Sequence, residues 1–171
     1  FGFIQSLYEA GSSWKPADGP ACVVGAGGAA RAVIVGLLDE GVPEIRLTNR
    51  SDHKAVDMAQ EFGPRVKAVP WSERHDALAG TALLVNTTNQ GMYGQPPLEI
   101  QLDALPKTAM VSDLIYIPLE TPLLAAARAR GHVTANGLGM LLNQAIPAFE
   151  AWFGVRPEVS AELRAVVQAT F

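Results

Sequence analysis

The sequence has little of what several classes of protein require. Its single cysteine, Cys22, excludes an internal disulfide, and its apolar surroundings are typical of a small buried side chain. No run approaches the roughly 20 apolar residues of a membrane-spanning helix. A net charge of -4 and a charged fraction of 18% argue against binding to nucleic acid or to a membrane surface. We therefore expect a cytoplasmic protein without nucleic-acid or membrane partners, in which any anion site is local.

Several motifs of enzyme chemistry are also missing. The three histidines, His53, His75 and His132, have no metal-ligand spacing with one another or with Cys22, so no metal site is predicted. The sequence has no Gly-x-Ser-x-Gly nucleophile elbow, and no Walker lysine follows its glycine-rich segment. Neither serine-hydrolase nor P-loop chemistry is indicated.

What the chain does contain is a regular alternation of predicted strands and helices. The predicted strands are 21–24, 44–48, 66–69, 82–85, 109–112 and 132–135. The predicted helices are a short one near 3–8, then 29–38, 52–62, 123–130, 137–153 and 157–170. This pattern predicts an α/β fold with a doubly wound parallel sheet of Rossmann type, with about six strands, helices on both faces and closing C-terminal helices. In such a sheet, ligands bind at the carboxyl ends of the strands.

The first loop at that edge reads Gly25-Ala26-Gly27-Gly28-Ala29, between a predicted strand and a predicted helix. Gly25 permits a sharp turn, and Gly27 lets the backbone approach a pyrophosphate. The helix that follows offers free N–H groups and the positive end of its dipole to an anion. The loop therefore predicts a dinucleotide site.

The second loop indicates which dinucleotide is bound. NAD sites usually carry an acidic residue at the end of the second strand, where it binds the ribose 2′-hydroxyl. Here that position reads Asn49-Arg50-Ser51, with Lys54 one helical turn further on. A guanidinium can bind a 2′-phosphate with two hydrogen bonds, and Lys54 adds a second positive charge. NADP is therefore the predicted cofactor.

Three further loops carry weaker signals, the last of them at the start of the helix predicted over 137–153. Asn86 and Thr87 follow the fourth strand, where they could line the cofactor or simply form a polar turn. Asp113 follows the fifth strand as either a base or a loop carboxylate, and Tyr116 could either bind a substrate or pack.

The helix predicted over 137–153 places Met140 and Gln144 on one face, four residues apart. They lie beside a predicted buried stripe formed by Leu138, Leu141, Ala145 and Phe149.

Five segments with distinctive letters occur together in order along the chain. They are Gly25-Ala26-Gly27-Gly28-Ala29-Ala30-Arg31-Ala32, Asn49-Arg50-Ser51, Asn86-Thr87-Thr88 with Gly91-Met92, Asp113-x-x-Tyr116-x-Pro118-x-x-Thr121-Pro122-Leu123, and Gly137-Leu138-Gly139-Met140-Leu141 with Gln144. This ordered set resembles the C-terminal NADP-binding domain of shikimate dehydrogenases over nearly the whole chain. Members of that family reduce 3-dehydroshikimate to shikimate with NADPH in aromatic amino acid biosynthesis.

The resemblance implies a contact for each segment. It implies pyrophosphate binding at residues 25–29 and binding of the adenosine 2′-phosphate at residues 49–54. It implies contacts to the nicotinamide end from Leu114, Gly137 and Met140, and contacts to shikimate or 3-dehydroshikimate from Tyr116 and Gln144.

The resemblance also bears on domain organisation. Family members carry an N-terminal substrate domain with a Ser-x-Ser motif, a catalytic lysine and an Asn-Thr-Asp-Gly motif whose aspartate pairs with that lysine. Phe1-Gly2-Phe3 resembles the segment just after that motif. We therefore expect one NADP-binding domain over 1–171, with residues 1–15 and 140–171 as helices at the hinge to a substrate domain absent from this chain. No catalytic residue is expected here, and the chain alone is expected to be inactive.

Alternative functions stay open at this stage. The chain could belong to a relative that acts on quinate, or to another two-domain dehydrogenase with a similar domain, such as glutamyl-tRNA reductase. It could also be a non-catalytic module that senses NADP. The sequence does not distinguish a monomer from a homodimer.

Overall fold

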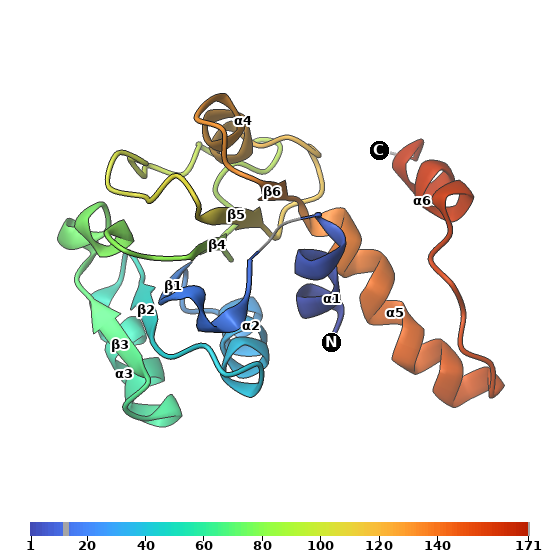
Figure 1. Cartoon of the computed structure of the whole chain (residues 1–171), viewed down its shortest axis with the longest axis horizontal. Coiled ribbons are helices and arrows are strands. Elements are labelled where there is room, and N and C mark those ends of the chain that lie inside the picture. Colours follow the sequence, from blue (N-terminus) through green and yellow to red (C-terminus); the bar gives the residue numbers. More distant parts are fainter. Residues whose placement is uncertain (12–13, 171) are drawn as a thin grey trace.

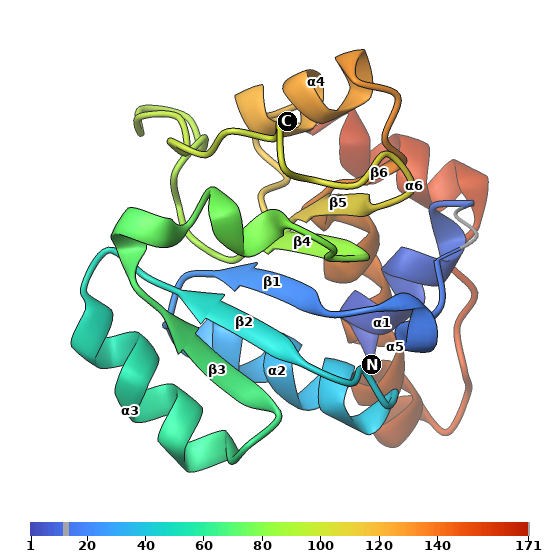
Figure 2. The same ribbon diagram turned by 60° about the vertical axis from the view of Figure 1, so that its left-hand side comes forward.

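The computed structural model describes residues 1–11 and 14–170. Its six strands are β1 (Ala21–Val24), β2 (Ile45–Thr48), β3 (Val66–Val69), β4 (Leu83–Asn86), β5 (Met110–Asp113) and β6 (Thr134–Ala135). They form one parallel sheet in the order β3-β2-β1-β4-β5-β6 (Figure 2). The predicted doubly wound parallel sheet is therefore confirmed.

The helices are α1 (Gly2–Glu9), α2 (Gly28–Asp39), α3 (Asp52–Phe62), α4 (Pro122–Ala129), α5 (Gly137–Phe153) and α6 (Ala161–Gln168), with short 3₁₀ turns η1 (Pro16–Asp18), η2 (Trp71–Glu73) and η3 (Asp76–Leu78). Three of the helices, α4, α5 and α6, begin after a residue whose side chain caps them. Thr121 accepts a hydrogen bond from the backbone of Leu124, and Pro122 follows at the first helical position. Asn136 caps α5 through the backbone N–H of Leu138.

Alternation along the strands divides the core into two layers, because successive side chains of a strand point to opposite faces. In β1, Val23 packs in a cluster with side chains of α1, α2 and α3. Its neighbours Cys22 and Val24 pack in a second cluster, with side chains of α4 and the segment 98–109. Helices thus cover both faces of the sheet, with α4 lying on the opposite side from α1 and α2 (Figure 1).

The register of the sheet brings the candidate loops to one edge. Val24 pairs with Thr48 on one side and with Asn86 on the other, and Asn86 pairs with Asp113. These residues end their strands, so the loops that follow them start side by side. This edge is where the predicted site residues were expected to meet.

Some predicted element boundaries were wrong. The last strand is Thr134–Ala135 and not 132–135, because the backbone N–H of His132 bonds to Ala127 at the end of α4. The last helix begins at Ala161 and not at 157, because the side chain of Ser160 caps it. Of the helix expected within 1–15, the helical part is Gly2–Glu9; residues 12 and 13, like 171, lie outside the described residues.

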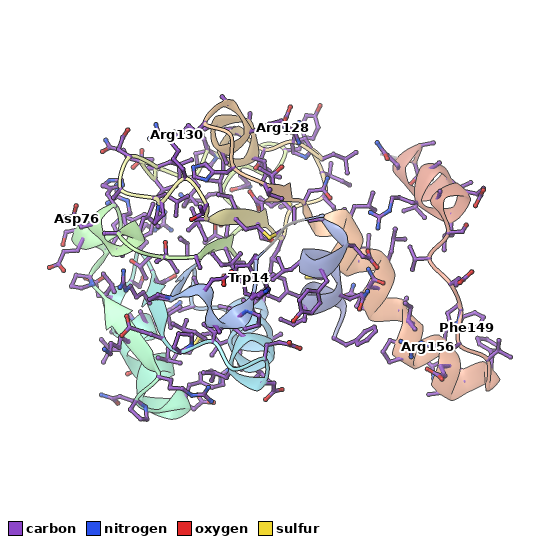
Figure 3. All side chains as sticks on the ribbon, in the orientation of Figure 1. Trp14, Asp76, Arg128, Arg130, Phe149 and Arg156 are labelled. Atoms are coloured by element: carbon purple, nitrogen blue, oxygen red, sulfur yellow. The ribbon has the colours of Figure 1, made fainter. Side chains whose placement is uncertain are left out.

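The predicted buried stripe of α5 was also wrong. Leu138 is buried, but Ala145 is exposed and Phe149 lies at the end of α5 remote from the sheet (Figure 3). The buried face continues instead through Asn143 and Ile146. The physical reason is helix α1, which lies along this face of α5 (Figure 1) and approaches closely at Gly139, where a Cβ would lie 3.0 Å from that of Ser6.

Candidate functional site

The glycine loop after β1 has a conformation that only glycine suits at its first position. Gly25 has φ +109°, and its N–H donates to the carbonyl of Thr48 at the end of β2. A Cβ there would lie 2.6 Å from Thr87 Oγ1 and 2.9 Å from Thr88 Cγ2. Any side chain at this position would therefore push away the loop that follows β4.

The next two glycines, in contrast, face open space. No atom lies within 4 Å of where a Cβ would stand on Gly27 or Gly28. Gly27 is the N-cap residue of α2, and no side chain caps this helix. The first N–H groups of α2 and the positive end of its dipole are therefore available to an anion at an uncrowded backbone surface.

Asn49 joins the glycine loop to the loop after β2. Its Oδ1 accepts a hydrogen bond of 3.2 Å from the N–H of Ala26, and its Nδ2 donates to the carbonyl of Ser51. The side chain thus holds the loop after β1 and the loop after β2 together.

A polar pocket of about 270 Å³ lies between these loops. It is lined by Gly25, Ala26, Gly27, Asn49, Arg50, Ser51, Lys54, Thr87 and Thr88. Both cationic side chains, Arg50 and Lys54, are exposed, and within 1–11 and 14–170 neither takes part in an ion pair. The pocket therefore combines uncompensated positive charge with free backbone donors, which suits a phosphorylated ligand.

Sequence reasoning missed Trp71, which lines an adjoining pocket together with Arg50 and residues 88–90, 95 and 96. Its backbone N–H donates to Asp52 Oδ1, and the guanidinium of Arg74 lies 4.5 Å from its ring centre. The only sequence signal was its place just after β3, at the same edge as the other loops.

Asn86 occupies a different position from the one expected of a direct ligand contact. It is fully buried, and its Nδ2 donates both to the carbonyl of Gln90 and to Asp113. Its Oδ1 accepts from the N–H and the hydroxyl of Thr88. The side chain therefore shapes the loop after β4, and Thr87 and Thr88 present that loop to the pockets.

A second, mainly apolar cavity of about 370 Å³ opens on the other side of this loop. Its walls are Ala29, Thr87, Thr88, Asn89, Met92, Leu114, Ile115, Tyr116, Ile117 and Met140. Four of the predicted site positions beyond the phosphate loops, Thr87, Leu114, Tyr116 and Met140, thus meet in one place. Met92, which belongs to a segment of the family resemblance, and Ile117 were assigned no role, because apolar side chains of this kind do not differ from core residues in the sequence.

Gly137, at the start of α5, packs against the loop after β5 that forms one wall of this cavity. Its N–H donates to the carbonyl of Ile115, and a Cβ on it would lie 2.0 Å from the carbonyl oxygen of Leu114. The start of α5 can therefore pack against the loop after β5 only where it has no side chain.

Gln144 lies outside both pockets. It is exposed on α5, one turn beyond Met140, and its backbone is in close contact with Gly2 of α1. The described residues thus do not bring Gln144 to Tyr116 within the cavity.

Other candidate groups take structural places. Asp113 is completely buried and does not line the cavity, so of its two predicted roles it has that of a loop carboxylate. Cys22 is buried in the sheet, and desolvation raises the pKa of its thiol to about 12. In the described part of the chain no group of three or more potential metal ligands occurs. None of the helices within 1–11 and 14–170 has both the length and the apolarity to cross a membrane.

Comparison with known families identifies two matching segments. Residues 12–93 match the family model "Shikimate / quinate 5-dehydrogenase", and residues 137–166 match "Shikimate 5'-dehydrogenase C-terminal domain". A shikimate dehydrogenase (NADP(+)) of Paramagnetospirillum magneticum is 56% identical over 98% of this chain. A protein of the same name from Dinoroseobacter shibae is 52% identical over 99%. The chain spans about 60% of the length of these relatives.

Solved structures resemble the whole fold. Shikimate 5-dehydrogenase of Thermus thermophilus, in complex with NADP(H) and shikimate, has a TM-score of 0.84 at 34% identity, over 99% of this chain and 61% of its own. Quinate dehydrogenase of Corynebacterium glutamicum in complex with NAD has a TM-score of 0.87 at 29% identity, over 98% and 60%. A 5-ketofructose reductase of Gluconobacter has a TM-score of 0.84 at 32% identity, over 99% and 62%.

Proposed function

Because this chain belongs to the shikimate dehydrogenase family, we propose that it holds NADP for the interconversion of 3-dehydroshikimate and shikimate. Relatives more than 50% identical carry the name of an NADP-dependent shikimate dehydrogenase. The chain spans about 60% of their length, so the activity of the whole protein is part of the proposal.

The pocket at Arg50 and Lys54 is the observation that carries the cofactor assignment. A 2′-phosphate placed there meets two cations that have no partner in the described structure, and NAD lacks that group. Asn49 and Ser51 line the same pocket, and residues 25–29 would receive the pyrophosphate at the start of α2.

The apolar cavity is the proposed place of the nicotinamide ring. Leu114 and Met140 would contact the ring, Gly137 would support it through the loop after β5, and Thr87 and Asn86 would shape its approach. Bound NADPH supplies a hydride to the substrate carbonyl carbon, while the carbonyl oxygen takes a proton. Tyr116 lies in the wall of the cavity, where its phenol would orient the substrate beside the ring.

Turnover by this chain alone would need a proton donor of its own beside the substrate. A donor must lie within hydrogen-bond reach of the reacting oxygen. None of the four lysines of the sequence lines the cavity, and its one titratable wall residue, Tyr116, is proposed to orient the substrate and not to donate the proton. We therefore expect cofactor binding without turnover by these 171 residues. Oxidation of shikimate or quinate by this chain with NADP would contradict that expectation.

The cofactor proposal is tested by calorimetric titration with NADPH and NADH. We expect tighter binding of NADPH, and Arg50→Ala should weaken it by a factor on the order of ten or more, because a charge-assisted pair is lost. NADH binding should be unaffected. Arg65→Ala is the matched control, since Arg65 is exposed and donates to the carbonyl of Leu38. A preference for NADPH that survives Arg50→Ala would mean that the 2′-phosphate binds elsewhere.

A further inference from the structure

The buried carboxylate of Asp113, the last residue of β5, receives hydrogen bonds from three separate segments. Asn86 Nδ2 and the backbone N–H of Ile115 each donate to Oδ1 over 3.1 Å, and Thr121 Oγ1 donates to Oδ2 over 2.7 Å. Asp113 has no exposed surface. Burial raises the pKa of this carboxyl, and its three hydrogen bonds oppose that shift. Such a group persists in a core only when its partners are held in place.

Each partner of Asp113 leads to a wall of the apolar cavity. Asn86 organises the loop after β4, from which Thr87 and Thr88 line the cavity. Ile115 lines the cavity itself and is followed by Tyr116.

Thr121, the third partner, connects Asp113 to the start of α4. Thr121 Oγ1 also accepts the N–H of Leu124, so one hydroxyl connects Asp113 to the start of α4. The Thr121 side chain lies beside Gly91, where an added Cβ would be 3.4 Å from Thr121 Cβ. The first part of the loop after β4 is therefore bonded to Asp113 through Asn86 and lies against its partner Thr121 at Gly91.

We infer that Asp113 is a positioning residue, which fixes the loops after β4 and β5 in the arrangement that receives the nicotinamide ring. It does not line the cavity, so it acts through Asn86, Ile115 and Thr121 rather than by touching a ligand. The inference rests on the proposed function, which places the nicotinamide in this cavity.

The position requires a carboxylate and not just a polar side chain of the same shape. Three donors converge on two acceptor oxygens. In Asp113→Asn one of these oxygens becomes an NH₂ group, which is a donor and must face either Thr121 or the pair of Ile115 and Asn86. Facing Ile115 and Asn86, the NH₂ group leaves both of their donors without an acceptor. Facing Thr121, it can donate to Oγ1, but the hydroxyl proton of Thr121 then loses its acceptor. In either orientation a buried donor is left unpaired, which weakens the hold on the loops.

The test compares two ligands that report on different ends of the site. NADPH is titrated by the fluorescence of its reduced nicotinamide, and 2′,5′-ADP, which has no nicotinamide, is titrated by calorimetry. In Asp113→Asn we expect the affinity for NADPH to fall on the order of tenfold, with loss of the fluorescence change, because a buried hydrogen bond to a charged group is broken. The affinity for 2′,5′-ADP should fall clearly less than that for NADPH, because its phosphates meet Arg50 and Lys54, which Asp113 does not hold, and of the loop after β4 only Thr87 and Thr88 line that pocket.

Two variants at Thr121 keep the test decisive if Asp113→Asn fails to fold. Thr121→Val removes the hydroxyl and should reproduce the selective loss of NADPH binding, whereas Thr121→Ser retains it and should behave as wild type. Hydrogen–deuterium exchange provides a readout without ligand: the amides of 87–90 and 114–117 should exchange faster in Asp113→Asn or Thr121→Val than in Thr121→Ser.

Two results would overturn the inference. One is unchanged NADPH fluorescence and exchange in a folded Asp113→Asn or Thr121→Val protein. The other is an equal loss of both ligands, which a general loss of structure would produce. Failure of the wild-type chain to bind either ligand would instead refute the proposed function, and unchanged exchange in the variants would still refute the role of Asp113.

Discussion

The two ends of the proposed cofactor site are built in different ways. At the 2′-phosphate end, the ligand would meet exposed side chains, because Arg50 on the loop after β2 and Lys54 in the first turn of α3 line a polar pocket. At the nicotinamide end, an apolar cavity is formed by loops whose shape depends on buried groups, among them Asp113 and Gly137.

Substitutions at the two ends should therefore affect ligand binding and the free energy of unfolding to different extents. A charged side chain on the surface can be removed with little effect on the free energy of unfolding, and the loss is felt by the ligand. A buried group that holds two loops affects stability and ligand binding together. Substitutions at the nicotinamide end should therefore have the larger and less separable effects.

The largest effect is expected for Gly137→Ala. The added Cβ would lie 2.0 Å from the carbonyl oxygen of Leu114, so α5 or the loop after β5 must move. We expect the free energy of unfolding to fall by about 3 kcal/mol, with loss of NADPH binding. Urea denaturation and fluorescence titration measure the two quantities.

Gly28→Ala is the matched control for stability. Gly28 is the first residue of α2, and a Cβ there meets no atom within 4 Å. We expect unchanged stability or a gain of up to about 1 kcal/mol, because alanine favours helix over glycine. Similar destabilisation by the two alanine substitutions would mean that the contact at Leu114 does not limit the fold.

A smaller effect is expected for Met140→Ala. Met140 is partly buried, lines the apolar cavity and packs against the core beneath the sheet. We expect a loss of about 1 to 2 kcal/mol in stability, below that of a fully buried methionine, and weaker binding of NADPH with unchanged binding of 2′,5′-ADP.

Met140→Leu conserves most of the side-chain volume and serves as the control. If Met140→Ala weakened the binding of 2′,5′-ADP as much as the binding of NADPH, the two ends of the cofactor site would not be energetically separate.

The smallest effect is expected at Glu44, just before β2 and away from both ends of the site. Lys67 Nζ and Arg46 Nε lie 2.6 and 3.0 Å from its carboxylate, and hydrogen bonds from Lys67 first and then Arg46 lower the pKa of Glu44. Glu44→Gln should cost less than about 1 kcal/mol near pH 7 and leave NADPH binding unchanged.

The pH dependence has a definite sign. A carboxyl group whose pKa is lowered on folding contributes its full stabilisation above the pKa of the unfolded chain, about 4.3 for glutamate. This stabilisation is lost as pH falls through the pKa of the folded protein. Thermal unfolding from pH 7 down to pH 3 should show the wild type and Glu44→Gln converging. A gap between them that does not shrink as pH falls below the unfolded pKa would contradict the role of these ion pairs.

The same contrast explains what the sequence could predict. The sheet and most helices can be predicted from local periodicity and caps. The proposed phosphate-binding loops can be predicted from glycines and cationic side chains, because these residues would contact the ligand directly. The buried face of α5 was mispredicted because α1, distant in sequence, decides it. Trp71 and the partners of Asp113 could not be found because their roles arise from contacts between separate loops.

Asn49 has a consequence for the kinetics of binding. Its amide joins the loops of Ala26 and Ser51 through the protein's own atoms, so this connection does not depend on a ligand contact and less ordering should accompany dinucleotide binding. The association rate should then be governed by diffusion and by attraction of the ligand's phosphates to Arg50 and Lys54, and it should fall as salt concentration rises. Dissociation, in contrast, would depend on the contacts that the loops after β4 and β5 make with the nicotinamide end of the ligand.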